Sequence, residues 1–167
     1  MQVVLISGLS GSGKSIATAV LEDAGYYCID NLPISLVEVV IRHLCGAGQH
    51  KIGIAVDARG GEDFAAFPAL LDKLKTEGFD VRVIFLEAKT MTLVKRFSET
   101  RRRHPLSSDT VSLSEAIQLE REKLGSAAEH AHRIDTSDLS PSALRMWIKD
   151  LISIDRSRIT LLFQSFG

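Results

Sequence analysis

The residues with the clearest chemistry form a run of eight near the start of the chain, Gly8-Leu9-Ser10-Gly11-Ser12-Gly13-Lys14-Ser15. Their spacing is that of a phosphate-binding loop (P-loop), Gly-x-x-x-x-Gly-Lys-[Ser/Thr]. The glycines let the backbone approach a triphosphate closely, so that the N–H groups of the loop and the N-terminus of the next helix converge on its charged oxygens. We expect Lys14 to reach the β- and γ-phosphates and the Ser15 hydroxyl to bind Mg²⁺.

A P-loop needs a buried strand before it and a helix after it. Residues 3–6 are a short, apolar, β-branched run typical of a buried strand. Apolar residues then recur at helical spacing before Gly25: Ile16, Ala17, Val20, Leu21 and Ala24. Because motif, strand and helix agree, we favour a P-loop over the alternative, a glycine-rich turn with a surface lysine.

Strand and helix patterns alternate along the rest of the chain. The sequence predicts further strands at 26–29, 51–56, 81–86 and 133–136, and helices at 35–44, 64–74, 91–103, 112–130 and 140–151. Ser35 is a candidate helix cap, and Ser112 with Glu115 has the spacing of a capping box. Continuously apolar strands indicate a parallel sheet with helices on both faces. We therefore predict an α/β fold of the kinase-like P-loop NTPase type, with a mostly parallel, five-stranded sheet.

Acidic residues follow several of these strands, at the edge where parallel sheets bind their ligands. Asp57 is positioned to hold Mg²⁺ through water, although a turn or helix-cap role is the alternative. Glu87 is a weaker rival for the metal role. Asp30 lies where small-molecule P-loop kinases often bind their acceptor, or it is a turn residue. Arg59 either pairs with Asp57 or contacts nucleotide.

A basic run occupies residues 89–104, with Glu99 as its acid and with these bases: Lys89, Lys95, Arg96, Arg101, Arg102 and Arg103. Such a run is usually a solvated helix face. P-loop kinases, however, carry a lid here whose planar guanidinium groups close on the phosphates. Arg96, Arg101 and Arg102 are the candidates, and the alternatives are surface solubility or binding of a polyanion such as RNA. His104 ends the helix before Pro105 and is a weak candidate base, so we identify no general base.

Composition sets limits on the function. The chain has 167 residues, 45% of them hydrophobic, which is enough for one domain with a sizeable core. A net charge of −1 gives no whole-chain attraction to nucleic acid. Cys28 and Cys45 lack metal-ligand spacing, so we expect free thiols in a reducing cytoplasm, with Cys28 buried. No apolar run approaches the roughly 20 residues of a membrane span.

The last residues do not fit the alternating pattern. Residues 159–163 form another apolar strand pattern, after which the sequence ends at Gly167. We therefore expect a P-loop nucleotide-binding domain at residues 1–154. Residues 155–167 are expected to be a linker and the first strand of a truncated C-terminal domain.

Several of these stretches together resemble the RapZ/YvcJ family of bacterial nucleotide-binding proteins, the RNase adapter proteins. The resemblance is carried by the P-loop and by residues 27–33 (Tyr-Cys-Ile-Asp-Asn-Leu-Pro), 57–59, 96–106 (ending Thr-Arg-Arg-Arg-His-Pro-Leu), 134–137 and 163–167. It implies ATP binding at the P-loop, GTP contacts at Val56, Asp57, Ala58 and Arg59, slow hydrolysis of both nucleotides, and homo-oligomers.

The resemblance also implies partners. The adapter members bind small regulatory RNAs and present them to an endoribonuclease, which tunes amino-sugar synthesis. Their RNA-binding basic tail and amino-sugar phosphate site belong to the C-terminal domain. We therefore expect an ATP/GTP-binding domain of a regulatory RNase adapter, with weak ATPase or GTPase activity. The alternatives are a small-molecule kinase with Asp30 at its acceptor site, and a nucleotide-gated regulator that does not hydrolyse.

Overall fold

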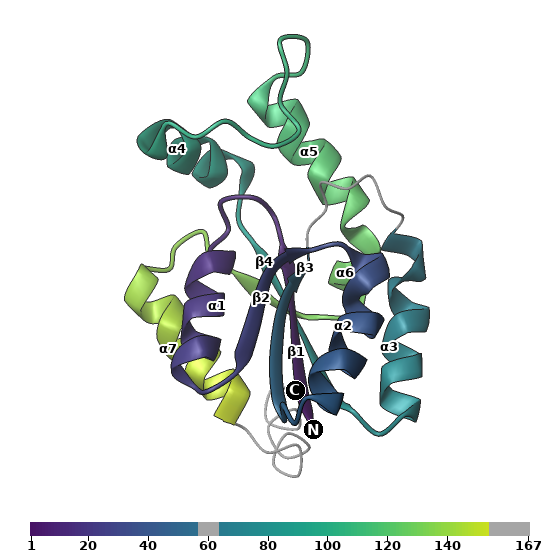
Figure 1. Ribbon diagram of the computed structural model, residues 1–167. Coiled ribbons are helices and arrows are strands. Elements are labelled where there is room, and N and C mark those ends of the chain that lie inside the picture. The colour runs from purple at the N-terminus through teal and green to yellow at the C-terminus, as the bar shows by residue number, and fades with distance from the viewer. Residues whose placement is uncertain (57–63, 154–167) are drawn as a thin grey trace, which may run out of the picture.

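The computed structural model describes residues 1–56 and 64–153 of the chain (Figure 1). The strands are β1 (Gln2–Gly8), β2 (Tyr27–Leu32), β3 (Lys51–Val56), β4 (Asp80–Glu87) and β5 (His132–Asp135). The helices are α1 (Lys14–Asp23), α2 (Ile34–Gly46), α3 (Phe67–Thr76, preceded by the 3₁₀ turn η1, Phe64–Ala66), α4 (Thr90–Thr100), α5 (Leu113–Lys123), α6 (Gly125–Glu129) and α7 (Pro141–Ser153).

The sheet is five-stranded with the order β2-β3-β1-β4-β5, and every pairing is parallel. The central strand β1 pairs with β3, where Val3 lies opposite Ile52, and with β4, where Val3 lies opposite Val81. Both neighbours of β1 are thus reached by crossovers through helices, as parallel pairing requires. The predicted fold class, an α/β P-loop fold with a parallel sheet flanked by helices on both faces, is confirmed.

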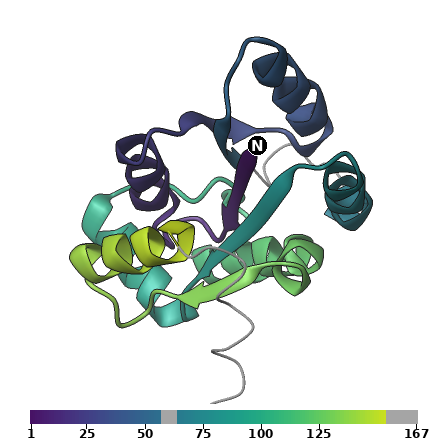
Figure 2. The same ribbon diagram turned by 90° about the horizontal axis from the view of Figure 1, so that it is seen from below.

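The helices form a layer on each face of the sheet (Figure 1). Helices α1 and α7 cover one face, and α2, α3 and α6 cover the other, as the view from below in Figure 2 also shows. Helices α4 and α5 lie beyond the carboxyl end of the sheet, above the loop that joins β1 to α1 (Figure 1). This arrangement places α4 and α5 next to the P-loop.

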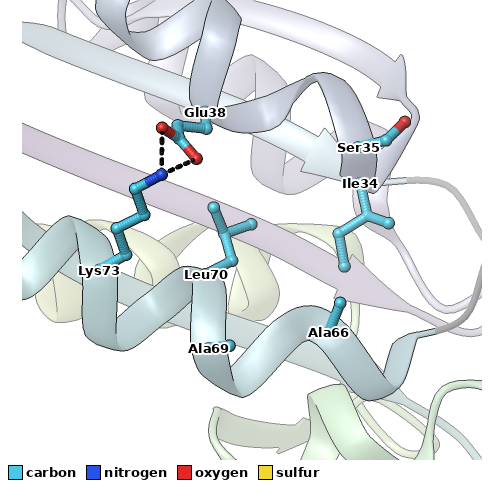
Figure 3. Close-up of a pocket in the computed structure, with 7 residues that line it drawn as sticks. All are labelled: Ile34, Ser35, Glu38, Ala66, Ala69, Leu70 and Lys73. Carbon is cyan, nitrogen blue, oxygen red and sulfur yellow. Dashed lines mark hydrogen bonds and ion pairs between the residues drawn. The ribbon is translucent and has the colours of Figure 1, made fainter.

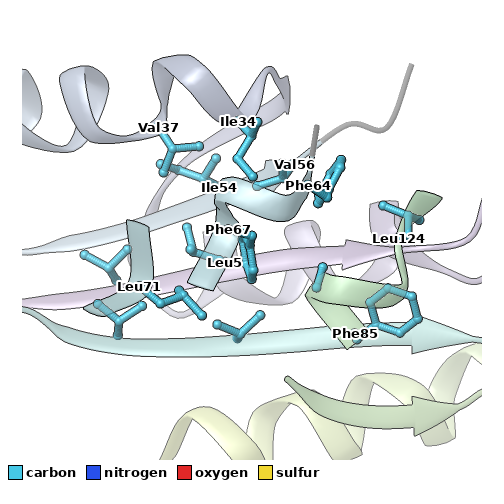
Figure 4. Close-up of a cluster of buried hydrophobic side chains, with 14 of the residues drawn as sticks. Leu5, Ile34, Val37, Ile54, Val56, Phe64, Phe67, Leu71, Phe85 and Leu124 are labelled. Atoms are coloured by element: carbon cyan, nitrogen blue, oxygen red, sulfur yellow. The ribbon is translucent and has the colours of Figure 1, made fainter. Parts of the chain in front are cut away.

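The period-two alternation of β1 builds a core on each face. Val3 and Leu5 pack with α2 and α3, whereas Val4 and Ile6 pack with α1 and α7. Figure 4 shows part of the larger cluster, in which Phe67 is fully buried. Each such side chain contributes roughly 1.5–3 kcal/mol by leaving water. The central strand is therefore fixed from both sides before it enters the loop.

The structure corrects several predicted boundaries. Strand β2 extends through Asp30 to Leu32, with an irregular register after Ile29 and a positive φ of 54° at Asn31. Helix α2 begins at Ile34 with Pro33 in the N-cap position, so Ser35 is not its cap. Because β2 is an edge strand, Cys28 is half-buried rather than buried.

The structure also settles the bounds of the helices predicted over 91–103 and 112–130. Helix α4 ends at Thr100 instead of residue 103, because Arg101 adopts the left-handed conformation with φ 51°. The helix predicted over 112–130 is two helices, α5 and α6, separated at Leu124. The capping box is confirmed: the Ser112 N–H donates to Glu115 Oε2 (2.8 Å) and the Glu115 N–H donates to Ser112 Oγ (3.3 Å).

Two further predictions concerned membrane spans and the division of the chain into domains. Within residues 1–56 and 64–153, no helix has both the length and the apolar character needed to cross a membrane. The predicted strand at 159–163 and the predicted division at residue 154 fall on residues outside the described ranges, and remain predictions.

Candidate functional site

The loop between β1 and α1 has a shape that its glycines make possible. Gly8 and Gly13 have φ values of 142° and 112°, which other residues rarely adopt. A Cβ on Gly8 would lie 2.2 Å from the Leu86 carbonyl oxygen of β4. The Leu9 N–H also donates to that oxygen at 3.0 Å, so the loop lies directly against β4. The backbone therefore turns sharply from β1 into α1.

Helix α1 begins at Lys14, directly after the left-handed N-cap residue Gly13. The first N–H groups of a helix lack partners within it and carry a partial positive charge, so they form an anion site. The Lys14 Nζ arches back over the loop and donates to the carbonyl oxygens of Gly8 (2.6 Å) and Leu9 (3.1 Å). An ammonium group and helix N–H groups thus lie on one loop.

Two loop serines differ in their surroundings. Ser15 is exposed on the first turn of α1, where its hydroxyl is accessible to a cation. Ser12 is 1% exposed, and its Oγ has no hydrogen-bond partner within residues 1–56 and 64–153. The glycine cradle, the Lys14 ammonium and this buried hydroxyl fit a phosphate group. Mg²⁺ is typically held by one or two protein oxygens together with substrate phosphates and water, which the exposed Ser15 fits.

Of the basic run, Arg96 is the residue that reaches the P-loop. Its Nη1 donates to the Gly11 carbonyl oxygen (3.1 Å) and to Thr136 Oγ1 (3.0 Å), and its Nη2 donates to the Thr136 carbonyl oxygen (2.6 Å). Thr136, which follows β5, in turn donates its hydroxyl to the Ser12 carbonyl oxygen (2.8 Å). Arg96 therefore fastens α4 to both the P-loop and the end of β5.

The other bases are dispersed. Arg101 and Arg102 are exposed just after α4. Exposed ion pairs join Lys89 to Asp138 (3.8 Å), Lys95 to Glu99 (3.9 Å) and Arg103 to Asp109 (3.2 Å). Such surface pairs are each worth about 1 kcal/mol or less. Of the three candidate lid arginines, the structure thus places Arg96 at the loop and Arg101 and Arg102 on the segment that follows α4.

A buried polar cluster beside the P-loop was missed by sequence reasoning. Glu120 of α5 accepts hydrogen bonds from the Ser10 N–H (2.8 Å), the Ser10 hydroxyl (2.7 Å) and His104 Nε2 (3.1 Å). Its signal is visible in the sequence: Glu120 shares the buried face of α5 with Ala116 and Ile117, and the buried Leu124 directly follows the helix. A carboxylate in such a row of apolar residues needs a partner.

Glu87, the rival metal ligand, is held by arginines. Its carboxylate accepts from Arg133 Nε (3.1 Å) and Nη2 (2.8 Å), and Arg121 Nη1 lies 3.8 Å away. The hydrogen bond from Arg133 is the main reason why the pKa of that guanidinium is raised. Glu87 therefore stabilises the β4–β5 edge.

The remaining predicted site residues lie elsewhere or beyond the described ranges. Asp57, Ala58 and Arg59 fall outside the described residues, and their roles remain predictions. Val56 ends β3 with its side chain in the core, so only its backbone is offered to a ligand. Asp30 is exposed on β2, and its Oδ1 accepts from the Asn31 N–H (2.9 Å).

A separate groove lies between α2 and α3 (Figure 3). It has a volume of about 490 Å³ and is lined by Ile34, Ser35, Glu38, Ala66, Ala69, Leu70 and Lys73. Lys73 Nζ donates to Glu38 across it at 2.7–2.9 Å, and this bond is the main reason why the pKa of Glu38 is lowered. None of the P-loop residues lines this groove.

Comparison with known proteins places these features in context. Residues 1–156 match the profile of the RapZ-like N-terminal domain. A nucleotide-binding protein of Thiobacillus denitrificans is 68% identical over 167 residues, covering 100% of this chain and 60% of the relative. One from Azoarcus is 58% identical over 168 residues, covering 100% of this chain and 58% of the relative. The chain thus spans about 60% of the length of these relatives.

Solved structures share the fold at low identity. The YorR protein of Bacillus subtilis, in complex with phosphorylated GDP, has a TM-score of 0.59 at 18% identity, covering 90% of this chain and 95% of its own. Shikimate kinase of Acinetobacter baumannii has a TM-score of 0.59 at 15% identity, covering 90% and 92%. A gluconokinase of Sinorhizobium meliloti has a TM-score of 0.58 at 18% identity, covering 98% and 97%.

Proposed function

The chain belongs to the family of the RapZ-like N-terminal domain, and on this premise we propose that it binds ATP or GTP with Mg²⁺ and hydrolyses it slowly. Its nucleotide-binding, kinase-like P-loop fold supports this proposal. The observation that carries the proposal is the cradle at the start of α1, where the glycine backbone, the helix N-terminus and the Lys14 ammonium share one loop.

The proposed roles follow from charge and position. The loop N–H groups and Lys14 bind the β- and γ-phosphates, and Arg101 and Arg102 neutralise charge that develops as the γ-phosphate leaves. Ser15 and Asp57 hold Mg²⁺, which supplies further charge neutralisation when bound. Water is the nucleophile, positioned in line. His104 is not its base, because both ring nitrogens are occupied, by Glu120 and by the Leu106 N–H (3.1 Å). Because we identify no general base among residues 1–56 and 64–153, we expect slow turnover.

The metal assignment is tested by two carboxylate variants. Asp57→Asn is expected to remove most of the Mg²⁺ dependence of nucleotide binding, measured by titration with and without the metal. Glu87→Gln is expected to leave that dependence unchanged, because its carboxylate is engaged by Arg133. The reverse outcome would move the metal role to Glu87.

Slow hydrolysis is tested by phosphate release from MgATP and MgGTP. We expect turnover that Lys14→Ala abolishes and that added sugars and other small hydroxyl compounds do not raise. Binding without any turnover would support the alternative, a nucleotide-gated regulator that does not hydrolyse.

A small-molecule kinase is the second candidate. The kinases for shikimate and gluconate among the structural neighbours, and the exposure of Asp30 at the carboxyl end of β2, favour it. Phosphate transfer to a hydroxyl compound that disappears in Asp30→Asn would establish the kinase. Turnover that no hydroxyl compound stimulates would support the hydrolase.

We further propose that the whole protein acts as a regulatory RNase adapter, forming homo-oligomers in the cytoplasm and presenting small RNAs to an endoribonuclease. Family membership and the extra length of the relatives support this proposal, with residues 155–167 leading into a C-terminal domain. RNA binding by residues 89–104 of this chain would weaken steeply with salt and disappear when Arg101, Arg102 and Arg103 are neutralised. Equal affinity at low and high salt would exclude that contribution.

A further inference from the structure

We propose that Glu120 is a positioning residue that couples the P-loop to the segment 101–112, through His104, so that nucleotide binding and docking of that segment stabilise each other. This inference rests on the proposed function, because it concerns how the same loop is regulated. It assigns a role to two buried residues that the hydrolysis chemistry does not use.

The contacts bring together three parts of the chain. Ser10 is the third residue of the P-loop, His104 lies after α4, and Glu120 is on α5. Glu120 Oε2 accepts from the Ser10 N–H (2.8 Å) and from His104 Nε2 (3.1 Å), while Oε1 accepts from the Ser10 hydroxyl (2.7 Å). One carboxylate thus fixes the backbone of the loop and the ring of His104 together.

Hydrogen bonding also fixes the form of the histidine. The Leu106 N–H donates to His104 Nδ1 at 3.1 Å, so Nδ1 carries the lone pair in the neutral ring. The ring proton is therefore on Nε2, the nitrogen that faces Glu120. In this tautomer His104 is a donor to Glu120 and an acceptor within its own segment, which makes it a link between the two.

Both side chains that link the P-loop to the segment 101–112 are buried. The side chains of His104 and Glu120 are 0% and 4% exposed. A carboxylate this buried is costly unless donors surround it, and losing one donor leaves the others to compensate for a charge in a medium of low polarity. We therefore expect the hydrogen bonds of this cluster to form and to break together.

The same cluster anchors the segment 101–112 at His104. Both the hydroxyl (2.8 Å) and the N–H (3.0 Å) of Ser107 donate hydrogen bonds to the His104 carbonyl oxygen. The His104 ring packs against Phe97 of α4, with centroids 5.2 Å apart. Arg101 and Arg102 precede His104 by three and two residues and are exposed, so undocking of His104 would free the backbone that carries both arginines.

The P-loop is thereby hydrogen-bonded to both α4 and α5. Glu120 of α5 holds Ser10, and Arg96 of α4 holds the Gly11 carbonyl oxygen (3.1 Å). A phosphate that orders the loop must then order the partners of Ser10 and Gly11 as well. Coupling of this kind is reciprocal. The factor by which bound nucleotide raises the docking equilibrium of the segment is also the factor by which docking raises nucleotide affinity.

The test measures amide hydrogen exchange of residues 101–112 with and without MgATP, alongside MgATP affinity by calorimetry. We expect MgATP to slow exchange in this segment of the natural chain. Glu120→Ala is expected to lose that protection at saturating MgATP and to bind at least about fivefold more weakly. Glu120→Gln keeps an acceptor for the Ser10 N–H and His104, and is expected to restore most of both effects.

The matched control is Glu122→Ala, which removes an exposed carboxylate from the same helix and should behave like the natural chain. Should Glu120→Ala not fold, a double-mutant cycle of Ser10→Ala and His104→Ala decides. If the two substitutions change the binding free energy of MgATP non-additively, the coupling is supported. If the change in the double variant equals the sum of the two single changes, the coupling is overturned.

The two proposals fail differently. If the natural chain binds MgATP and Glu120→Ala keeps the full protection of residues 101–112, the coupling is wrong and nucleotide binding stands. If the natural chain binds no nucleotide, the proposed function is wrong and the coupling falls with it.

Discussion

At the scale of single residues, the loop depends on positions where a side chain has no space. Gly8→Ala would place a Cβ 2.2 Å from a backbone oxygen of β4, at a φ of 142°. We expect a loss of unfolding free energy of about 2–4 kcal/mol, or no folding at all, measured by urea unfolding. Backbone atoms of an interior strand such as β4 cannot move aside as a side chain would.

Gly46→Ala is the control for that prediction. Gly46 ends α2 without a positive φ, and a Cβ there meets nothing within 4 Å. The change should be neutral or stabilise by up to about 1 kcal/mol, because alanine favours the helix. Similar losses in the two variants would show that the approach of the loop to β4 is unimportant for stability.

Cys28 supplies a residue-scale prediction about pH. Burial, and secondly the charge of Glu22, raise the pKa of the Cys28 thiol to about 11 from its ordinary 9.0. At pH 8 the thiolate is then about a hundredfold rarer in the folded chain than in the unfolded chain. In a Cys45→Ser background, alkylation of Cys28 should slow by about that factor on folding, and equal rates would contradict the prediction.

The same shift affects stability at high pH. Because the folded thiol holds its proton more tightly, its stabilising contribution is complete below pH 9 and is lost as the pH rises to about 11. The unfolding free energy should therefore fall across this window more steeply in the natural chain than in Cys28→Ala. Parallel curves would show that Cys28 has the same pKa in both states.

At the scale of elements, α4 was predicted as a helix that carries lid arginines, whereas α5 was predicted as a helix with no role beside the P-loop. Periodicity can identify which residues of a helix are buried, and in α5 the buried residues are Ala116, Ile117 and Glu120. It cannot identify a partner 110 residues away, such as Ser10, because that contact depends on how the helices cross the sheet edge. Arg96 was predicted as a lid residue near the phosphates, but its bonds to the Gly11 and Thr136 carbonyl oxygens were not predicted, for the same reason.

The boundaries that sequence reasoning missed have local physical causes. The left-handed φ of 51° at Arg101 ends α4 early. The spacing of apolar residues does not reveal that one residue adopts a left-handed backbone conformation. Asp30 was placed after β2, but the strand continues past it with an irregular register. In contrast, the capping box at Ser112 was predicted correctly, because its partners are three residues apart.

Helix α5 should depend on that capping box. Ser112→Ala removes the acceptor of the Glu115 N–H and should lower the unfolding free energy by about 1 kcal/mol. Ser114→Ala, on the exposed side of the first turn, is the control and should have little effect. Equal stability of the natural chain and Ser112→Ala, by thermal or urea unfolding, would mean that tertiary packing alone holds α5.

At the scale of the whole molecule, the strand pattern and the P-loop together predicted the fold class. Continuously apolar strands specified a parallel sheet, and the order β2-β3-β1-β4-β5 then places the P-loop at the centre of its carboxyl edge. The strand order itself was not predicted, because each apolar strand is compatible with several neighbours. The structure resolves that ambiguity through the pairings of β1 with β3 and β4, of β2 with β3 and of β4 with β5.

The most direct test of the account is calorimetric titration of MgATP and MgGTP into the natural chain, Lys14→Ala and the surface control Lys75→Ala. Lys14 lies on the loop, with its Nζ at 2.6 Å from the Gly8 carbonyl oxygen, whereas Lys75 is exposed on α3. We predict binding to the natural chain and to Lys75→Ala, and at least about tenfold weaker binding to Lys14→Ala. Equal affinity in all three proteins, or binding in none, would contradict a nucleotide site at the β1–α1 loop.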